Sequence, residues 1–165
     1  MKRLFSPWRM KYIQNAKTQN DRQGCIFCNS LKGLDDLVVF TGKNAFSILN
    51  LFPYTSGHMM VAPIEHKGSL EELTPQTRNE MMELVSQCVV VLKKVYRPEG
   101  FNIGANIGEV AGAGVPDHVH IHIVPRWAGD TNFMTTVGEV RVLPESVEES
   151  CKRIRSAWRD LYPSP

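Results

Sequence analysis

The sequence predicts an α+β domain built on a mainly antiparallel sheet. Three observations predict this class. Apolar residues recur at steps of three and four over 75–96, which is typical of one long amphipathic helix. Histidine and aliphatic side chains alternate along 118–124, which is typical of a half-buried strand. Shorter stretches bounded by turn residues lie on both sides of the long helix, so strands, a helix, strands and a final helix follow one another.

Five stretches are predicted to be strands, because each is apolar or alternating and is closed by residues that favour turns. They cover 38–40, 46–51, 59–63, 101–107 and 118–124. The last two are separated by a glycine-rich loop at 108–117. The sequence leaves open whether the strands before and after the long helix run parallel or antiparallel.

Two stretches are predicted to be helices. The longer covers 75–96, where Thr74 supplies a capping hydroxyl and Pro75 suits the first helical position. The second covers 144–161 and carries apolar residues at helical spacing.

Length and composition fit one globular domain. The chain has 165 residues, of which 42% are hydrophobic and 22% are charged. These values exclude a wholly disordered or fibrous chain. We expect a polar N-terminal arm at residues 1–24 and a single domain at residues 25–165, which is long enough to bury a core without disulfides.

Charge and hydropathy limit the expected partners. A net charge of +2 is too small to indicate a nucleic-acid-binding protein. The longest apolar runs, such as 89–92, are far too short to span a bilayer. The basic N-terminus contains no apolar stretch of signal-peptide length. We therefore expect a cytoplasmic protein with no membrane or nucleic-acid partner.

The four cysteines fall into two classes. Cys25 and Cys28 form a C-x-x-C pair, which in a reducing compartment indicates metal or redox chemistry rather than a disulfide framework. A redox motif needs a thioredoxin-like βαβ context, which the predicted elements lack, whereas the spacing suits two zinc ligands. Cys88 and Cys151 fall in helical patterns and are predicted to be small core residues.

Three of the five histidines lie in one predicted strand, as His118-x-His120-x-His122. Because a strand alternates faces, these side chains point the same way, with Cα atoms about 6.5–7 Å apart at each step. The aliphatic residues between them are expected to enter the core. A polar face with histidines clustered by chance is the alternative, but imidazoles crowded on one face repel one another when protonated. His58 and His66 lie at the two ends of the third predicted strand.

Two kinds of chemistry use such a histidine face. Imidazoles at alternate strand positions can hold zinc, which takes three or four nitrogen or sulfur ligands. Alternatively, one histidine acts as a nucleophile while the others position the substrate. The glycine-rich loop at 108–117 offers backbone N–H groups that can cradle phosphate oxygens, although a plain hairpin loop is the alternative. Beside a histidine face, it favours a phosphoryl or nucleotidyl group held next to an imidazole.

These features resemble the histidine-triad (HIT) family of nucleotide hydrolases and transferases. The resemblance is carried by Gly57-His58, the loop at 108–117 and the stretch His-Val-His-Ile-His-Ile-Val-Pro-Arg at 118–126. It spans about residues 25–127 in order, and the ends of the chain look most like the bacterial branch of diadenosine-tetraphosphate phosphorylases or hydrolases. The resemblance implies a HIT-like fold with a mainly antiparallel five-stranded sheet, one long helix and a C-terminal helix.

The resemblance implies a role for each histidine of the candidate active site. His120, the middle residue of the triad, would attack the α-phosphorus and form a nucleotidyl-histidine. His122 and His58 would hydrogen-bond phosphate oxygens and assist the leaving group. A neutral imidazole is a competent nucleophile near pH 7 when a partner fixes its tautomer. Asn50 would contact the sugar, with a strand-end cap as its alternative role.

The phosphate-binding loop departs from the eukaryotic members of the family. Asn106 and Gly108 occupy the stretch that lies beside the phosphates in relatives. The stretch Gly112-Ala113-Gly114 lacks the Gln-Ser or Gln-Thr that those members carry before the triad. Backbone amides must then bind phosphate in place of these side chains, so the substrate preference of those members does not transfer directly.

Two further residues follow the triad. Arg126 is predicted to pair with a carboxylate at the surface. Trp127 is either a buried anchor or a platform on which a second base stacks.

A zinc site is also implied by the resemblance. In HIT proteins with a C-x-x-C pair, the other ligands are a histidine after the third strand and the first triad histidine, here His66 and His118. With Cys25 and Cys28 these form a closed Cys₂His₂ set, which is typical of structural zinc. Such a site would tie the N-terminal segment to the triad strand, keep His118 neutral and leave the other triad histidines for chemistry.

The implied function is cleavage of a dinucleoside polyphosphate, above all diadenosine tetraphosphate, through a nucleotidyl-His120 intermediate. Water would then release AMP, as in a hydrolase, whereas inorganic phosphate would release ADP, as in a phosphorylase; the resemblance leans towards phosphorylase. Mg²⁺ commonly accompanies polyphosphate substrates. Family members are commonly homodimers, with the long helix and a strand edge at the interface. The sequence offers a second apolar cluster for this interface at 89–91, beside the buried face of the long helix.

Three alternatives to this function stay open on the sequence. The first is a purine-nucleotide-binding protein without activity, in which a His120→Ala variant would behave like wild type. The second is a nucleoside phosphoramidate hydrolase. The third is a metallohydrolase that holds its metal with the three triad histidines, although no H-x-H-x-D-H pattern supports it.

Overall fold

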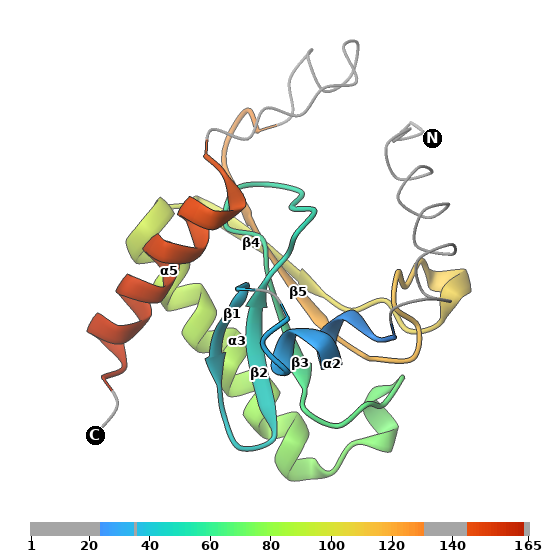
Figure 1. Ribbon diagram of the computed structural model, residues 1–165. Coiled ribbons are helices and arrows are strands. Elements are labelled where there is room, and N and C mark those ends of the chain that lie inside the picture. The colour runs from blue at the N-terminus through green and yellow to red at the C-terminus, as the bar shows by residue number, and fades with distance from the viewer. Residues whose placement is uncertain (1–23, 35, 131–144, 164–165) are drawn as a thin grey trace, which may run out of the picture.

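The computed structural model describes residues 24–34, 36–130 and 145–163. Its centre is a five-stranded sheet in the order β1-β2-β3-β5-β4, in which every neighbouring pair is antiparallel (Figure 1). The strands are β1 (Val38–Thr41), β2 (Ala45–Leu49), β3 (Met59–Pro63), β4 (Gly100–Gly104) and β5 (Ile121–Arg126). The predicted fold class is confirmed. The strands before and after the long helix, whose relative direction the sequence left open, are antiparallel. Apart from Gly24, the predicted N-terminal arm lies outside the described residues.

The helices follow the predicted order with one addition. They are α2 (Ile26–Leu31), α3 (Pro75–Tyr96) and α5 (Val147–Leu161), together with the short 3₁₀ turns η1 (Leu70–Glu72) and η2 (Glu109–Ala111). The α3 helix begins as predicted, because the Thr74 side chain accepts a hydrogen bond from the Thr77 N–H and proline occupies the first turn. It ends at Arg97, whose left-handed backbone (φ 48°) turns the chain out of the helix.

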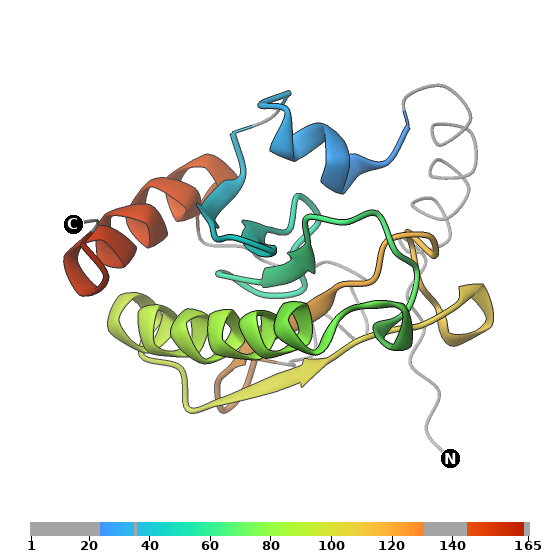
Figure 2. The same cartoon turned by 90° about the horizontal axis from the view of Figure 1, so that it is seen from below.

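The helices lie on both faces of the sheet (Figure 2). One face carries the main core, where β2, β3 and β5 pack against α3, and α5 packs against α3 and β1. Val119, Ile121 and Ile123 enter this core, as the alternation predicted, and Cys88 and Cys151 are buried in it. The opposite face carries a smaller core beneath α2. No helix among the described residues has both the length and the apolar character needed to cross a bilayer.

The α2 helix is missing from the sequence prediction. Its six residues give less than two turns, so no periodicity identifies it. Phe27 is 1% exposed and packs against Phe46, Ile48 and Met60 on the sheet. A helix this short is marginal alone, so this contact with residues distant in sequence stabilises it.

The strand that carries the triad begins later than predicted, at Ile121 rather than His118. The ladder between β3 and β5 stops at the Val61–Ile121 pair. Before that pair, the Val119 N–H donates to the Lys67 carbonyl (2.7 Å) instead of to β3. His118 and His120 therefore lie on extended chain just before β5 and still face the side opposite the main core. Similarly, β4 covers 100–104 rather than 101–107.

Glu80 of α3 fastens the turn between β1 and β2. Its carboxylate accepts hydrogen bonds from the backbone N–H groups of Lys43 (2.7 Å) and Asn44 (3.0 Å) and from the Asn44 side-chain amide (2.6 Å). Burial raises the pKa of Glu80, but these hydrogen bonds outweigh it, so the pKa lies below its usual range. A side chain at Gly42 would clash with this carboxylate.

We expect Glu80→Ala to lower the free energy of unfolding by about 2 kcal/mol, because hydrogen bonds to a charged acceptor are lost. Urea titration at pH 7 measures this. The contribution is fully present above the unfolded-state pKa of the carboxyl and is lost as pH falls through its lower folded-state pKa, so the two proteins should converge in acid. Glu83→Ala, on an exposed position of the same helix, is the control and should change stability by less than about 0.5 kcal/mol. Equal losses in the two variants would contradict the role of Glu80.

Candidate functional site

The triad histidines line the face of the sheet that α2 covers. His118 is fully buried and His120 is 4% exposed, while His122 is half-buried on β5. The Phe27 ring of α2 packs over the first two, with ring centroids 5.1 Å from His118 and 4.8 Å from His120. His122 pairs with Met60 on β3 and Gly104 on β4, so it lies between two strands rather than at an edge of the sheet.

Hydrogen bonding assigns the two nitrogens of His118. Its Nε2 lies 2.8 Å from the carbonyl oxygen of Pro63 at the end of β3. A carbonyl only accepts, so the neutral ring carries its proton on Nε2 and leaves a lone pair on Nδ1. Burial lowers the pKa of His118, with the nearby His66 and His120 lowering it further, which keeps the ring neutral. The Nδ1 lone pair faces the sulfur atoms of Cys25 (3.2 Å) and Cys28 (3.8 Å).

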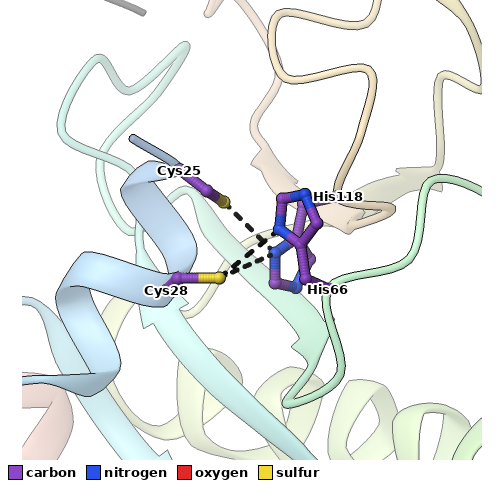
Figure 3. A group of neighbouring side chains, drawn as sticks. All are labelled: Cys25, Cys28, His66 and His118. Carbon is purple, nitrogen blue, oxygen red and sulfur yellow. Dashed lines mark hydrogen bonds between the residues drawn. The ribbon is translucent and has the colours of Figure 1, made fainter. Parts of the chain in front are cut away.

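Four side chains converge on this lone pair, as Figure 3 shows. The ligand atoms of Cys25, Cys28, His66 and His118 all lie within 4.8 Å of one another. The thiols come from the start of α2 and from α2 itself, and His66 follows β3, with its Nδ1 3.4 Å from Cys28 Sγ. The structure thus brings together the four residues that the sequence predicted as metal ligands.

The geometry of this cluster fits a tetrahedral zinc ion. Sulfur and nitrogen atoms bound to zinc at ordinary distances on a tetrahedron lie about 3.5 Å apart. The three sulfur–nitrogen distances of 3.2, 3.4 and 3.8 Å bracket this value. The Pro63 carbonyl on the far nitrogen of His118 is the usual outer partner of a zinc-ligating imidazole.

Electrostatics of the thiols agree with a cation site. Burial raises the pKa of Cys25, and the neighbouring Cys28 thiol raises it further. A thiolate at Cys25 is therefore favoured only with a positive charge beside it, so metal binding would release a proton. In the described part of the chain, His120 and His122 do not belong to this or any other such group of metal-capable side chains. This arrangement argues against a metal shared by the three triad histidines.

His120 has the opposite nitrogen assignment. Its Nδ1 lies 2.9 Å from the carbonyl oxygen of His118, so Nδ1 carries the proton and Nε2 carries the lone pair. Burial lowers the pKa of His120 and favours the neutral ring, although the hydrogen bond from its N–H to the carbonyl acts in the other direction. A neutral imidazole with its tautomer fixed by a backbone acceptor is a competent nucleophile.

His58 and His122 form a hydrogen-bonded pair. Nε2 of His58 lies 3.0 Å from Nδ1 of His122, and the rings are 5.1 Å apart. The backbone N–H of Tyr54 donates to Nδ1 of His58 (3.1 Å). Because this N–H is a donor only, Nδ1 of His58 accepts and Nε2 carries the proton. His122 then accepts on Nδ1, so its own proton lies on Nε2.

Asn50 lies at the end of β2, next to this pair. Its Oδ1 accepts from the Phe52 N–H (2.9 Å), and its Nδ2 lies 3.3 Å from Nδ1 of His58. In this structure Asn50 therefore closes the turn after β2 and contacts a histidine. Contact of Asn50 with a sugar stays a prediction.

The glycine-rich loop starts and ends beside the triad. The chain leaves β4 after Gly104, which pairs with His122, passes through the loop at 108–117 and reaches the triad at His118. The loop is closed by the Asn106 side chain, whose Nδ2 donates to the Gly112 carbonyl (3.3 Å). Gly108 (φ 81°) and Gly112 (φ 90°) both require the left-handed backbone that glycine permits.

The exposure of this loop differs along its length. Gly108 and Gly112 are exposed, whereas Ala113 and Gly114 are half-buried. Phosphate binding by these residues stays a prediction.

Arg126 and Trp127 lie at the other end of β5. Arg126 pairs with Asp130 (2.5 Å) and donates to Asn102 (2.6 Å), so the predicted surface ion pair is present. The Trp127 indole N–H donates to the Tyr96 carbonyl at the end of α3 (3.4 Å). Trp127 follows the triad by five residues, about 16 Å along an extended strand, so within one chain it is remote from His122.

Two contributors to the site escaped the sequence analysis. Phe27 packs over two triad histidines but lies in the unpredicted α2 helix. Tyr54 holds His58 through its backbone, and its ring lies 4.6 Å from the His58 ring. The sequence held one signal for each of them. Phe27 lies between the two cysteines of the C-x-x-C pair, and Tyr54 precedes His58 by four residues.

The sequence of the chain is similar to those of several known proteins. A family model described as "HIT domain" matches residues 32–129. The chain is 36% identical over 165 residues to the "AP-4-A phosphorylase" of Mycobacterium tuberculosis, which covers 96% of this chain and 85% of that protein. It is 31% identical over 137 residues to the adenosine 5'-monophosphoramidase of Schizosaccharomyces pombe, with 78% of this chain and 98% of that protein covered.

A solved structure shares both fold and sequence. The zinc-bound histidine triad family protein from Mycobacterium smegmatis superimposes with a TM-score of 0.69 and 30% identity. The match covers 84% of this chain and 95% of that one.

We expect the purified protein to hold one zinc ion per chain and His66→Ala to lose it on dialysis against a chelator. His66 is exposed, so its removal leaves the core intact, and lost binding energy should lower the melting temperature by at least about 4 °C. Elemental analysis and thermal melting measure the two effects. His122→Ala is the control and should keep the metal. A wild-type protein that binds no zinc, or a His66→Ala variant that retains it, would refute the site.

Proposed function

The chain belongs to the HIT family, and from this premise we propose that it is a nucleotidyl-transferring enzyme that cleaves dinucleoside polyphosphates, above all diadenosine tetraphosphate. The relative named AP-4-A phosphorylase covers nearly the whole chain and supports this substrate class. The substrates and products would be adenine nucleotides.

The observation that carries the proposal is the orientation of His120. Its Nδ1–H is held by the His118 carbonyl, so the Nε2 lone pair is available for attack on phosphorus. The ring is buried and neutral, which keeps the lone pair unprotonated.

In the first step, Nε2 of His120 attacks the α-phosphorus and forms an N–P bond. The P–O bond to the leaving polyphosphate breaks, and its electron pair stays on the departing oxygen. His122 would donate from Nε2 to a phosphate oxygen, and a donor already in place stabilises the charge that develops there. The sequence also assigned His58 to phosphate, but both of its nitrogens are used, by the Tyr54 N–H and by His122, so it would instead hold His122 in position. Asn50, Asn106 and the glycine loop are our candidates for holding the sugar and phosphates.

In the second step, an acceptor attacks the nucleotidyl-His120 and restores the imidazole. Inorganic phosphate gives ADP, whereas water gives AMP. Similarity over 96% of the chain to a protein named as a phosphorylase supports inorganic phosphate. Mg²⁺ would enter with the polyphosphate, since it binds phosphate oxygens in such substrates.

Zinc would be structural in this enzyme. Cys25, Cys28, His66 and His118 would hold it, and when bound it would supply a cross-link rather than a reactive water, because four protein ligands close the site. His118 thereby belongs to the metal site through its ring and to the active site through its carbonyl. The reduced thiols that zinc requires suit the cytoplasm.

We propose a homodimer, with residues 25–165 as one catalytic domain and residues 1–24 as an arm. The sequence suggested 89–91 as an apolar cluster for the interface, but Val91 is buried in the core and only Val90 of that cluster is exposed. The edge strand β4 offers a further surface, since Ile103 is 48% exposed. Trp127, remote from the triad of its own chain, would then act as a base platform at the site of the second subunit.

A nucleoside phosphoramidate is the second candidate substrate. Similarity to a protein named as an adenosine 5'-monophosphoramidase favours it, because that relative shares 31% identity over 78% of this chain. The attack by His120 would be the same, and only the leaving group would differ.

We expect wild-type protein to convert diadenosine tetraphosphate to ADP and ATP when inorganic phosphate is present, and His120→Ala to lose at least about 10³-fold in kcat, because the nucleophile is absent. Chromatography of the products with and without phosphate measures both. AMP and ATP formed without phosphate would identify a hydrolase instead. Equal turnover by wild type and His120→Ala would rule out the covalent route. Zinc content serves as the folding control for the variant.

A further inference from the structure

The two thiols at the start of α2 differ from the other two cysteines in their access to solvent. All four cysteines lie in the described residues, and of these Cys25 and Cys28 are half-buried, whereas Cys88 and Cys151 are buried in the main core. Burial raises the pKa of Cys88 to about 12, so this thiol stays protonated and unreactive. An oxidant in solution therefore meets one pair of sulfur atoms.

The backbone places this pair one helical turn apart. Cys25 is the N-cap of α2 and Cys28 lies in its first turn, where the Asn29 N–H donates to the Cys25 carbonyl (3.0 Å). Side chains three residues apart on a helix are neighbours, and the two sulfur atoms lie within 4.8 Å of each other. Disulfide oxidoreductases use the same C-x-x-C spacing for a dithiol that closes and opens reversibly. A disulfide between these two residues therefore needs only a local change in the chain.

The fold separates this chemistry from catalysis of disulfide exchange. A catalytic dithiol lies in a thioredoxin-like βαβ unit, whereas every neighbouring pair of strands in this sheet is antiparallel. Oxidation of the pair therefore concerns the protein itself and not a disulfide partner.

Solvent reaches the pair from the side of Cys28. Both sulfur atoms point towards the two imidazoles of the cluster (Figure 3). The contact between Cys28 Sγ and His66 Nδ1 is exposed. The contact between Cys25 Sγ and His118 Nδ1 is partly buried. Metal-bound cysteines are thiolates, the form that reacts with peroxides, so Cys28 is the sulfur that a peroxide reaches first.

Two neighbours of the pair connect it to the triad. His118 faces both sulfur atoms with Nδ1, and its carbonyl holds the Nδ1–H of His120 (2.9 Å). Phe27 lies between the two cysteines in the chain, and its ring packs 4.8 Å from that of His120. A helix of six residues is marginal alone, so loss of a metal cross-link at its start would loosen α2. The rings of Phe27 and His118 would then lose their fixed positions beside His120.

We propose that Cys25 and Cys28 are a site of oxidative modification, at which a peroxide converts the zinc-bound pair to a disulfide, releases the metal and lowers the reactivity of His120 until the disulfide is reduced. The inference rests on the proposed zinc site, and its effect on catalysis rests on the proposed nucleotidyl transfer.

The modification is a two-electron oxidation. The Cys28 thiolate attacks one peroxide oxygen, the O–O bond breaks and the sulfur becomes a sulfenic acid. The Cys25 thiolate then attacks that sulfur, so the S–S bond forms and hydroxide leaves. The two thiolates lose two electrons in all, and hydrogen peroxide takes them up with two protons to give two molecules of water. A disulfide carries no charge, and the two imidazoles that remain are too few ligands to hold zinc.

The first test uses zinc-loaded full-length protein and hydrogen peroxide, with a chromophoric chelator that measures the zinc released. Trypsin releases both cysteines in one peptide, residues 23–32, whose mass falls by two hydrogens when the disulfide forms. We expect this peptide to appear at the rate at which one zinc ion per chain leaves, while Cys88 and Cys151 stay reduced. Zinc that stays bound after the disulfide has formed, or a pair that peroxide leaves reduced, would overturn the inference.

Two variants test the connection to the active site. His66→Ala removes an exposed zinc ligand and keeps both thiols. We expect metal-free His66→Ala and oxidised wild type to share a kcat at least about tenfold below that of zinc-loaded wild type, with little change in KM, because a misplaced catalytic group slows the reaction. Peroxide should not lower the kcat of His66→Ala further. Glu65→Ala, at the exposed position before it, is the control and should keep the zinc, the kcat and the response to peroxide of wild type.

Reversal separates the disulfide from other oxidative damage. A phosphine reductant opens a disulfide but leaves methionine sulfoxide unchanged. We expect the reductant with Zn²⁺ to restore kcat, and the reductant with a chelator to restore the thiols but not kcat. Recovery of kcat without zinc, or a kcat that oxidation does not lower, would refute the connection to His120. If the protein cleaves no nucleotide, the proposed function fails, whereas zinc release and the mass of the peptide still decide whether the pair is the site of modification.

Discussion

His118 is bound at both ring nitrogens and at its backbone carbonyl, and the candidate site depends on these three contacts. Nε2–H donates to Pro63, which forces the lone pair of the ring onto Nδ1 and towards the two thiols. The carbonyl accepts the Nδ1–H of His120 and leaves Nε2 of that ring, the nitrogen that we propose as the nucleophile, unprotonated. A shift of α2 or of the end of β3 would therefore move His118, and through its carbonyl it would change the position of His120. A metal ion held by Cys25, Cys28, His66 and His118 would therefore influence the orientation of His120 without contacting it.

The fold class and the residues on each face follow from the sequence, because periods of two and about 3.6 residues place side chains directly. The α3 helix and the buried Val119, Ile121 and Ile123 were predictable for this reason. The α2 helix was not, since Phe27 stabilises it by packing on strands that follow it in the chain. The start of β5 was not predictable either, because it depends on where β3 stops and the Lys67 carbonyl replaces it as a hydrogen-bond partner.

Which histidines lie together in the structure was predictable, but which nitrogen of each carries the proton was not. Residue type and alternation identified the triad, and the C-x-x-C spacing identified the thiols. The nitrogen assignments depend on backbone groups, namely the carbonyls of Pro63 and His118 and the N–H of Tyr54. Any residue except proline at position 54 would supply the same backbone N–H, so no sequence pattern predicts this contact. The positions of main-chain groups in the folded chain therefore determine which nitrogen of each histidine carries the proton.

The two halves of the site have opposite nitrogen assignments, and this asymmetry has a chemical consequence. The His118 carbonyl leaves the lone pair of His120 on Nε2, whereas the Tyr54 N–H acts through His58 to leave the proton of His122 on Nε2. In the proposed mechanism these are the nucleophile and the hydrogen-bond donor. Both states exist before substrate binds, so neither costs reorganisation during the reaction.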